Sequence, residues 1–356
     1  MRIVVDMNHP AHVHYFKNFI QEMRKKGHEV LITASEKDIT FRLLESYHLD
    51  FSNVGNYGAS QIKKIINLPI IDLRYYKLMK SFKPDMLIGF GSIRAAHASF
   101  LLKKPCINFE DTENSTEQIR LYLPFVKAVC TPSCYNGFLG KKQIRFNSYM
   151  ELASLHPDRF TPNPAVLNEI GLTPDDSYIV VRFVSWQASH DVGQHGIRDK
   201  VGLVKALEQY GRILITSEGK LPEELQSYRI RVSPEKLHDL LYYATLYVGE
   251  GATTASECAM LGTHAIYVNT ISAGTIAEEE KKYDLISDFS RRACTDKAVL
   301  AEAVKLLENK KLKAEGKLKR ELIVKEKCDV TSFMTWFVEN YPHSFTMMKE
   351  HQGMQH

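Results

Sequence analysis

The sequence lacks the marks of a membrane-spanning or secreted protein. It has no apolar run of about 18 residues, the length that indicates a transmembrane helix. It also has no signal peptide, because Met1 and Arg2 lead straight into the apolar strand Ile3-Val4-Val5. We therefore expect a cytoplasmic protein. The basic cluster Arg24-Lys25-Lys26 is either plain solvated charge or a peripheral contact with the inner face of the membrane.

Cysteine and net charge are also scarce. The six cysteines are scattered, and only Cys130 and Cys134 lie near each other, so no zinc-site spacing is present. Buried free thiols in a reducing compartment fit this pattern. The net charge is 46 − 42 = +4, which is too small to indicate a nucleic-acid partner.

Several motifs that carry familiar chemistry are missing. No G-x-G-x-x-G follows the first strand, which argues against a nicotinamide or flavin cofactor. Neither the G-x-x-x-x-G-K-[ST] of P-loop nucleotidases nor the G-x-S-x-G of serine hydrolases occurs. No D-x-D follows a strand in the manner of metal-dependent sugar transferases. We therefore expect neither a resident cofactor nor a metal.

The chain does contain a regular alternation of short apolar strands and amphipathic helices. The first half begins with a βαβ unit formed by strand 2–5, helix 13–26 and strand 30–33. The second half repeats the plan from strand 178–183, with a short strand at 229–232. This alternation predicts an α/β protein with two doubly wound, Rossmann-like parallel sheets facing across a cleft. Ligands of such sheets bind at the carboxyl ends of the strands.

Composition suggests where the domains divide. Four prolines and several turn residues interrupt the pattern between about 151 and 176, so we expect domains at 1–150 and 177–330 with a linker at 151–176. A Lys-rich helix at 297–325 is typical of a solvated surface. In the segment 331–356, an aromatic helix must pack on something, with the first domain as the candidate, before a frayed end.

The most informative stretch is 246–270, a strand, a tight turn, a helix and a second strand. The helix begins after Gly251 with Ala252, Thr253 and Thr254, and bare amides and hydroxyls at a helix start favour a phosphate. Glu257, one turn further in, could accept from the two hydroxyls of a ribose. The alternative is an ordinary turn whose threonines cap the helix.

Three other loops at predicted strand ends hold polar residues. In the first, His9 and His12 precede a helix and are both catalytic candidates. His12 is the best candidate for a general base, with capping as the alternative. In the second, Glu110 leads an acidic cluster that either raises a pKa for acid/base work or caps the next helix. The third, residues 183–193, offers diphosphate contacts or is a plain surface loop; its candidate residues are Ser185, Ser189 and His190.

These segments together resemble the GT-B superfamily of nucleotide-sugar proteins. The nearest enzymes in pattern are the N-acetylglucosaminyltransferase that makes the peptidoglycan lipid precursor and the non-hydrolysing UDP-N-acetylglucosamine 2-epimerase. The whole chain is most similar to a bacterial and archaeal family of unknown function in that superfamily. This resemblance covers about residues 1–340 and includes the segments Asn8-His9-Pro10, Gln187-Ala188-Ser189-His190 and Gly251-Ala252-Thr253-Thr254 with Glu257.

The resemblance implies an acceptor-side first domain and a second domain that binds a nucleotide-sugar donor of the UDP type. It places Gly251 to Thr254 on the diphosphate, Glu257 on the ribose, and His12 and Glu110 in catalysis. Two features depart from the pattern. His9, Pro10 and Ala11 replace the glycines of the transferase's first turn, and Gly89-Phe90-Gly91-Ser92 lacks the aspartate of the epimerase's G-D-T motif.

Three functions therefore compete. The first is a metal-independent glycosyltransferase that moves a sugar to a glycan or lipid-linked acceptor in surface-polysaccharide synthesis. The second is a UDP-N-acetylhexosamine 2-epimerase, which the missing aspartate makes less suitable because that chemistry needs several acid/base groups. The third is a noncatalytic nucleotide-sugar-binding protein. The sequence allows a homodimer but does not name the sugar, the acceptor or the oligomeric state.

Overall fold

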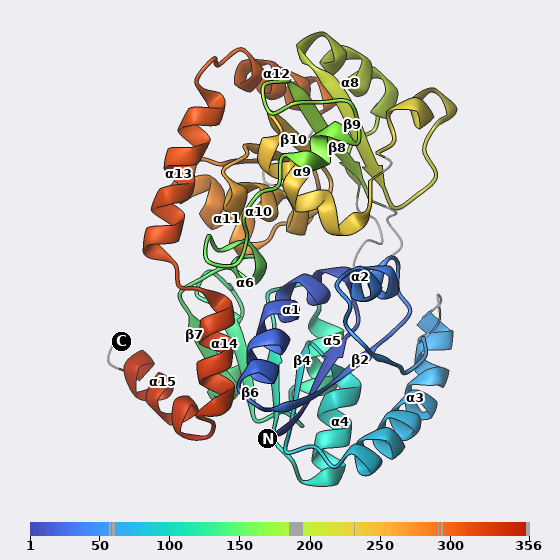
Figure 1. Ribbon diagram of the computed structural model, residues 1–356, viewed down its shortest axis with the longest axis vertical. Coiled ribbons are helices and arrows are strands. Elements are labelled where there is room, and N and C mark those ends of the chain that lie inside the picture. Colours follow the sequence, from blue (N-terminus) through green and yellow to red (C-terminus); the bar gives the residue numbers. More distant parts are fainter. Residues whose placement is uncertain are drawn as a thin grey trace. The chain divides into compact units, whose positions relative to one another are not determined.

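The chain forms two compact units, which are described separately (Figure 1). One consists of Met1–Ser154 together with Cys328–His356, and the other of Leu155–Lys327. The computed structural model describes residues 1–56, 58, 61–184, 195–230, 232–290, 292 and 295–353. Each unit is built on one sheet in which every strand pairing is parallel. The expectation of an α/β protein with two parallel sheets is thereby confirmed.

The first unit contains a seven-stranded sheet in the order β3-β2-β1-β4-β5-β6-β7. Its strands are short and almost wholly buried, as befits a sheet that helices cover: β1 Arg2–Met7, β2 Glu29–Ala34, β3 Ser52–Asn53, β4 Met86–Phe90, β5 Cys106–Phe109, β6 Ala128–Pro132 and β7 Gln143–Phe146. The chain winds from β1 through β2 to β3, then returns to β4 on the other side of β1. The strand order therefore reverses between β1 and β4, where doubly wound sheets bind ligands.

Helices connect these strands: α1 Pro10–Lys25, α2 Thr40–Ser46, α3 Gln61–Phe82, α4 Ile93–Leu102, α5 Thr116–Tyr122 and the short α6 Leu152–Leu155. The helical spacing of Phe16, Phe19, Ile20 and Met23 places all four on the buried face of α1, where each is 0% exposed. After α1 the chain reverses at Gly27, whose φ of +84° is a conformation that favours glycine.

The last segment of the chain returns to the first unit. Helix α14 Val330–Glu339 packs against α1, and α15 His343–Gly353 follows it. Val330, Met334, Phe337 and Val338 are 0% exposed, so α14 supplies part of the core of this unit. Among the described residues, none of the helices combines the length and apolarity needed to cross a bilayer.

The second unit contains a five-stranded sheet in the order β12-β11-β10-β8-β9. Its strands are β8 Tyr178–Phe183, β9 Arg212–Ser217, β10 Leu246–Gly249, β11 Ala265–Tyr267 and β12 Ile286–Asp288. The order reverses between β8 and β10. The expected strand at 229–232 was wrong: among the described residues of that stretch, Arg229 makes only one isolated bridge, to Ile215.

The helices of the second unit are α7 Ala165–Asn168, α8 Lys200–Leu207, α9 Leu237–Tyr243, α10 Ala252–Leu261, α11 Gly274–Glu278, α12 Asp296–Leu307 and α13 Leu312–Glu326. The single Lys-rich helix expected at 297–325 is in fact two helices. The side-chain oxygen of Asn309 accepts from the amide of Lys311 at 2.9 Å, a local turn that competes with continued helix. Buried thiols were expected, and Cys106, Cys130 and Cys258 are buried, but Cys134 is half-buried and Cys328 is exposed.

Candidate functional site

Three polar loops meet at the carboxyl edge of the first sheet. They follow β1, β4 and β5, which are neighbouring strands. His12 lies in the first turn of α1, directly after the first loop, and Glu110 lies in the third loop. Phe90, at the end of β4, contacts the first turns of α1. The ring of Phe90 lies 4.8 Å from the ring of His12 and 5.4 Å from that of Tyr15. The structure thus brings His12 and Glu110 to the same edge, beside the point where the strand order reverses.

The two histidines of the first loop both bind backbone amides. Nδ1 of His9 accepts from the amide of Ala11 at 3.2 Å and so caps α1. Nδ1 of His12 accepts from the amide of Asn8 at 3.1 Å, and the residue is only 8% exposed. Burial lowers the pKa of His12 well below its usual value, and the neighbouring charges act in the same direction. His12 is therefore neutral at physiological pH.

Glu110 is a buried carboxyl group with two donors. It is 2% exposed, and its Oε1 accepts from the amide of Thr112 at 2.9 Å while Oε2 accepts from the hydroxyl of Tyr122 at 3.0 Å. Burial, with a further contribution from Asp111, raises the pKa of Glu110 to about 8 despite these bonds. Glu110 is therefore mainly protonated at neutral pH.

Asp111 and Glu151 share the hydroxyl of Tyr15. The pKa of Asp111, which is half-buried, is raised to about 6, chiefly by burial, while its contact with Tyr15 acts the other way. The same Tyr15 hydroxyl lies 3.3 Å from Oε1 of Glu151. A phenol has one proton, so it can donate to only one carboxylate at a time. With Glu110, this cluster offers one protonated and one ionised carboxyl near neutral pH, the arrangement that acid/base catalysis requires.

A fully buried ion pair stabilises this part of the first unit. Asp6 in β1 and Arg94 in α4 are both 0% exposed, and Nη2 of Arg94 lies 2.8 Å from Oδ1 of Asp6. Ser92 and Thr33 donate to the same carboxylate at 2.5 and 2.6 Å. The pair fixes the end of β1 against the start of α4, and it therefore positions the loop that leads into α1, the helix that carries His12. We did not predict it, although an aspartate ending an apolar strand was a visible signal.

In the second unit, α10 begins at the carboxyl end of β10. Gly251 is its N-cap and has no side chain to bind the first amides, and Ala252, Thr253 and Thr254 form the first turn. Thr254 is 6% exposed, whereas Gly251, Ala252 and Thr253 are half-buried. The first amides of a helix have no partner within it, so this start is suited to an anion.

Glu257 lies inside this helix and is engaged by a residue that sequence reasoning missed. Its Oε1 is 3.0 Å from Nε2 of His238 in α9, and its side chain is 8% exposed. The carboxylate is therefore oriented by a buried histidine, since His238 is 2% exposed. Its role towards a ribose remains a prediction.

Glu250, between the two glycines, was also missed. It is 1% exposed, and its two carboxylate oxygens accept from the amides of Val184 at 2.8 Å and Ile197 at 3.0 Å. Asn269, after β11, donates to the carbonyl of Glu250 at 2.9 Å. Glu250 therefore ties the end of β8 to residue 197 and to the end of β10. A charged residue directly after a buried strand was the signal. Three predicted diphosphate contacts, Ser185, Ser189 and His190, lie outside the described residues.

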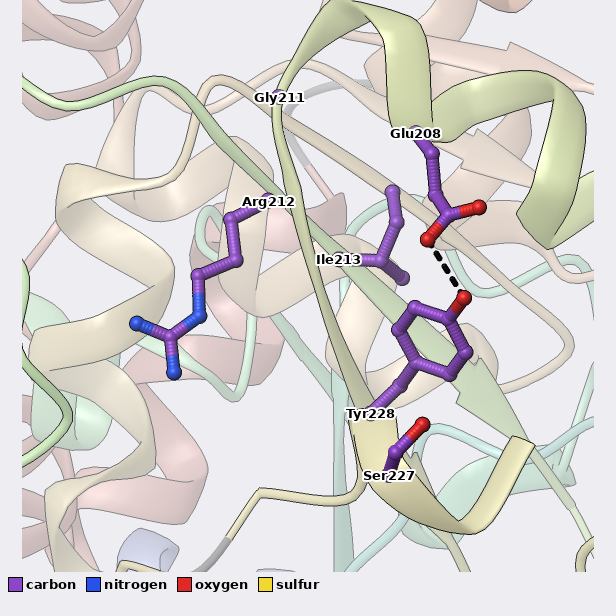
Figure 2. Close-up of a pocket in the computed structure, with 6 residues that line it drawn as sticks. All are labelled: Glu208, Gly211, Arg212, Ile213, Ser227 and Tyr228. Atoms are coloured by element: carbon purple, nitrogen blue, oxygen red, sulfur yellow. Dashed lines mark hydrogen bonds between the residues drawn. The ribbon is translucent and has the colours of Figure 1, made fainter. Parts of the chain in front are cut away.

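Two hollows of the second unit lie at the other edge of its sheet. One of about 450 Å³ is lined by residues around the start of β9, where Tyr228 donates to Glu208 (Figure 2). Gly211 precedes β9 and Arg212 begins it, so this hollow is at the amino edge, where such sheets do not bind their ligands. Within the described ranges, no group of three His, Cys, Asp or Glu side chains is arranged to hold a metal ion.

Solved structures share this architecture. The spinosyn forosaminyltransferase SpnP matches with a TM-score of 0.64 and 14% identity, over 98% of this chain and 99% of that one. A UDP-N-acetylglucosamine 2-epimerase from Neisseria meningitidis, solved with UDP-N-acetylglucosamine, matches with a TM-score of 0.62 and 11% identity, over 95% and 99%. At these identities the likeness shows the fold alone, which is GT-B.

Sequence relationships identify the family. An uncharacterised protein of Methanocaldococcus jannaschii, MJ0665, is 25% identical over 271 residues, which are 72% of this chain and 79% of the relative. The predicted resemblance to a GT-B family of unknown function is confirmed. Since residues 1–334 match the family model described as a protein of unknown function, DUF354, the chain belongs to that family.

Proposed function

We propose that this protein is a metal-independent glycosyltransferase. It moves a sugar from a UDP-type donor to a hydroxyl of a glycan or lipid-linked acceptor in surface-polysaccharide synthesis. The observation that carries the proposal is Asp111, a half-buried carboxyl at the ligand-binding edge of the first sheet. Its pKa of about 6 leaves it ionised at neutral pH and still basic enough to assist removal of an acceptor proton.

The start of α10 supports the donor half of the proposal. Its uncapped amides and the positive end of the helix would stabilise the charge that develops on a departing nucleoside diphosphate. Glu257, held by His238, would accept from the ribose hydroxyls. Ser185, Ser189 and His190 remain proposed diphosphate contacts because of the polar loop that carries them.

The test is to incubate the full chain with a panel of nucleotide sugars and with glycan and lipid-linked acceptors, and to follow the products by mass spectrometry. We expect acceptor-dependent release of the nucleoside diphosphate. Asp111→Asn should lower the rate by roughly 10²- to 10⁴-fold while donor binding persists. Asp175→Asn, at an exposed aspartate, is the matched control and should leave the rate unchanged. Donors that bind and are recovered unchanged with every acceptor would contradict the proposal.

A UDP-N-acetylhexosamine 2-epimerase is the second candidate, and one observation favours it. Glu110 is mainly protonated and Asp111 mainly ionised at neutral pH, which supplies the paired acid and base that the missing G-D-T aspartate had made doubtful. Incubation with UDP-N-acetylglucosamine in deuterated water separates the two candidates. An epimerase that removes and returns the C2 proton places deuterium on that carbon, whereas a transferase leaves the carbon unlabelled.

A further inference from the structure

The imidazole of His12 is held in one tautomer by the backbone. Its Nδ1 lies 3.1 Å from the amide nitrogen of Asn8 and accepts that N–H. A backbone amide can only donate, so Nδ1 must present its lone pair. In a neutral imidazole the remaining proton is then on Nε2. The ring therefore offers an N–H donor, not a lone pair, on its other side.

The surroundings keep this ring neutral. The charged and titratable groups that act on it are His9, Lys37 and Arg94, and all three oppose a further positive charge. Protonation at Nδ1 would also break the bond to Asn8 and set two N–H groups against each other. A neutral histidine whose proton is fixed on Nε2 cannot serve as a base through that nitrogen.

The Nε2 atom is open to a ligand. His12 is more than nine-tenths buried, with 8% of its surface exposed. In the described part of the chain, Nε2 has no hydrogen-bond partner, yet it is not sealed from solvent. The side-chain oxygen of Asn8, by contrast, is buried without a partner. An almost buried donor that reaches the surface beside Phe90 is placed to meet a substrate oxygen.

We propose that His12 acts as a neutral hydrogen-bond donor, through Nε2–H, to an oxygen of the sugar nucleotide that carries or gains negative charge, and that it is not the general base. This inference rests on the proposed function, and it assigns the role of general base to the carboxyl cluster of Glu110, Asp111 and Glu151. The positive charge of Lys37 and the start of the sixteen-residue helix α1 favour the same kind of oxygen.

The tautomer can be measured without any activity. In long-range ¹H–¹⁵N spectra of the full chain labelled at histidine nitrogens, the His12 signals are assigned by their loss in His12→Gln. We expect an unprotonated Nδ1, a protonated Nε2 and no titration between pH 5.5 and 8. A proton on Nδ1, or a titration midpoint near the ordinary histidine value, would overturn the inference and leave His12 free to be the base of the proposed transferase.

Ligand titration identifies the oxygen. UDP and UDP-N-acetylglucosamine are added separately, and binding is followed in the same samples by ³¹P signals. A shift of the His12 Hε2 proton with UDP indicates a diphosphate oxygen, and a shift only with UDP-N-acetylglucosamine indicates an oxygen of the sugar; either supports the inference. Binding that leaves Hε2 unmoved contradicts it. If neither ligand binds, the proposed function fails while the tautomer result stands.

Substitution separates a donor from a base. Glutamine places an amide N–H near the position of Nε2 but cannot take a proton. We expect His12→Gln to retain kcat/KM within roughly tenfold and His12→Ala to lose about 10²- to 10³-fold, the usual effect of removing one such donor. Equal losses in both variants would overturn the donor role. His14→Gln, in the same helix but facing Tyr47, is the matched control and should leave kcat/KM unchanged.

Discussion

Glu110 is the residue at which burial and ionisation conflict most directly. Its pKa is about 8 in the folded chain and near 4.5 when exposed, so the folded state binds this proton more tightly. The contribution of Glu110 to folding stability is therefore fully present below about pH 4.5 and is lost as the pH rises towards 8. We expect Glu110→Gln to remove this destabilisation, which is at most about 5 kcal/mol and is reached above pH 8. The free energy of unfolding is measured with denaturant at pH 5, 7 and 8.5, with the exposed Glu117→Gln as control. If the pH dependence of the wild type runs parallel to that of Glu110→Gln, the prediction is refuted.

The same carboxyl groups should set the pH dependence of turnover. Asp111 must be ionised to act as a base, so kcat/KM is expected to rise with pH through about 6. Asp111→Asn should abolish that rising limb. If the reaction is epimerisation, a falling limb near pH 8 should follow, because Glu110 then loses the proton that it must donate. An unchanged rising limb in Asp111→Asn would assign the base to another group.

The buried pair of Asp6 and Arg94 should be costly to break. Arg94→Met leaves an uncompensated carboxylate in a fully buried site, and we expect a loss of about 3–5 kcal/mol in the free energy of unfolding. The double variant Asp6→Asn/Arg94→Met should recover part of this loss because no lone charge remains. A double variant as unstable as the sum of its single variants would show that the two residues are not coupled.

Single residues also show how far the sequence could be interpreted. His12 and Glu110 could be named because polar side chains after apolar strands converge at one sheet edge. The tautomer of His12 could not be foreseen, since it depends on one amide hydrogen bond. Tyr15 and Glu151 were missed because they lie 136 positions apart and meet only through the fold.

At the scale of elements, Glu250 connects three segments of the second unit. Glu250→Gln keeps one acceptor oxygen of two, so the amide of Val184 or Ile197 loses its partner. We expect hydrogen exchange at these two amides to accelerate by roughly tenfold or more, since an unpaired buried donor costs about 1–3 kcal/mol. Exchange followed by NMR tests this, with exposed Glu224→Gln as control. Equal exchange in both variants would show that Glu250 does not hold these ends.

Elements were predicted well where one physical rule dominated. Helix α1 follows from apolar spacing, and α10 from the glycines that flank it. The errors arose where local hydrogen bonds determine where a helix or strand begins and ends. The side chain of Asn309 ends α12 early, and the stretch near Arg229 pairs at one residue only. Hydrophobic periodicity does not report either event.

At the scale of the whole molecule, the alternation of strands and helices was enough to predict two parallel sheets. It could not give the strand order, which depends on tertiary pairing. The sheets differ in size, with seven and five strands, but in both the order reverses beside the first strand of the unit. The candidate residues follow these central strands, so the topology explains why they gather.

The first unit is completed by residues from the far end of the chain. Val330, Met334, Phe337 and Val338 of α14 are fully buried, and burying four such side chains contributes on the order of 6–12 kcal/mol. That is comparable to the whole stability of a typical domain. We therefore expect a chain ending at Lys327 to lose protection from hydrogen exchange throughout β1, β4 and β5, while β8 and β10 of the second unit stay protected.

Two controls make this test decisive. A chain ending at Glu350 retains all of α14 and should keep full protection in both sheets. Adding a synthetic peptide of residues 328–353 to the shortened chain should restore protection of β1, because α14 packs directly against α1 beside that strand. If the chain ending at Lys327 protects β1 as well as the full chain does, the buried face of α14 is not required, and the core of the first unit is sufficient without it.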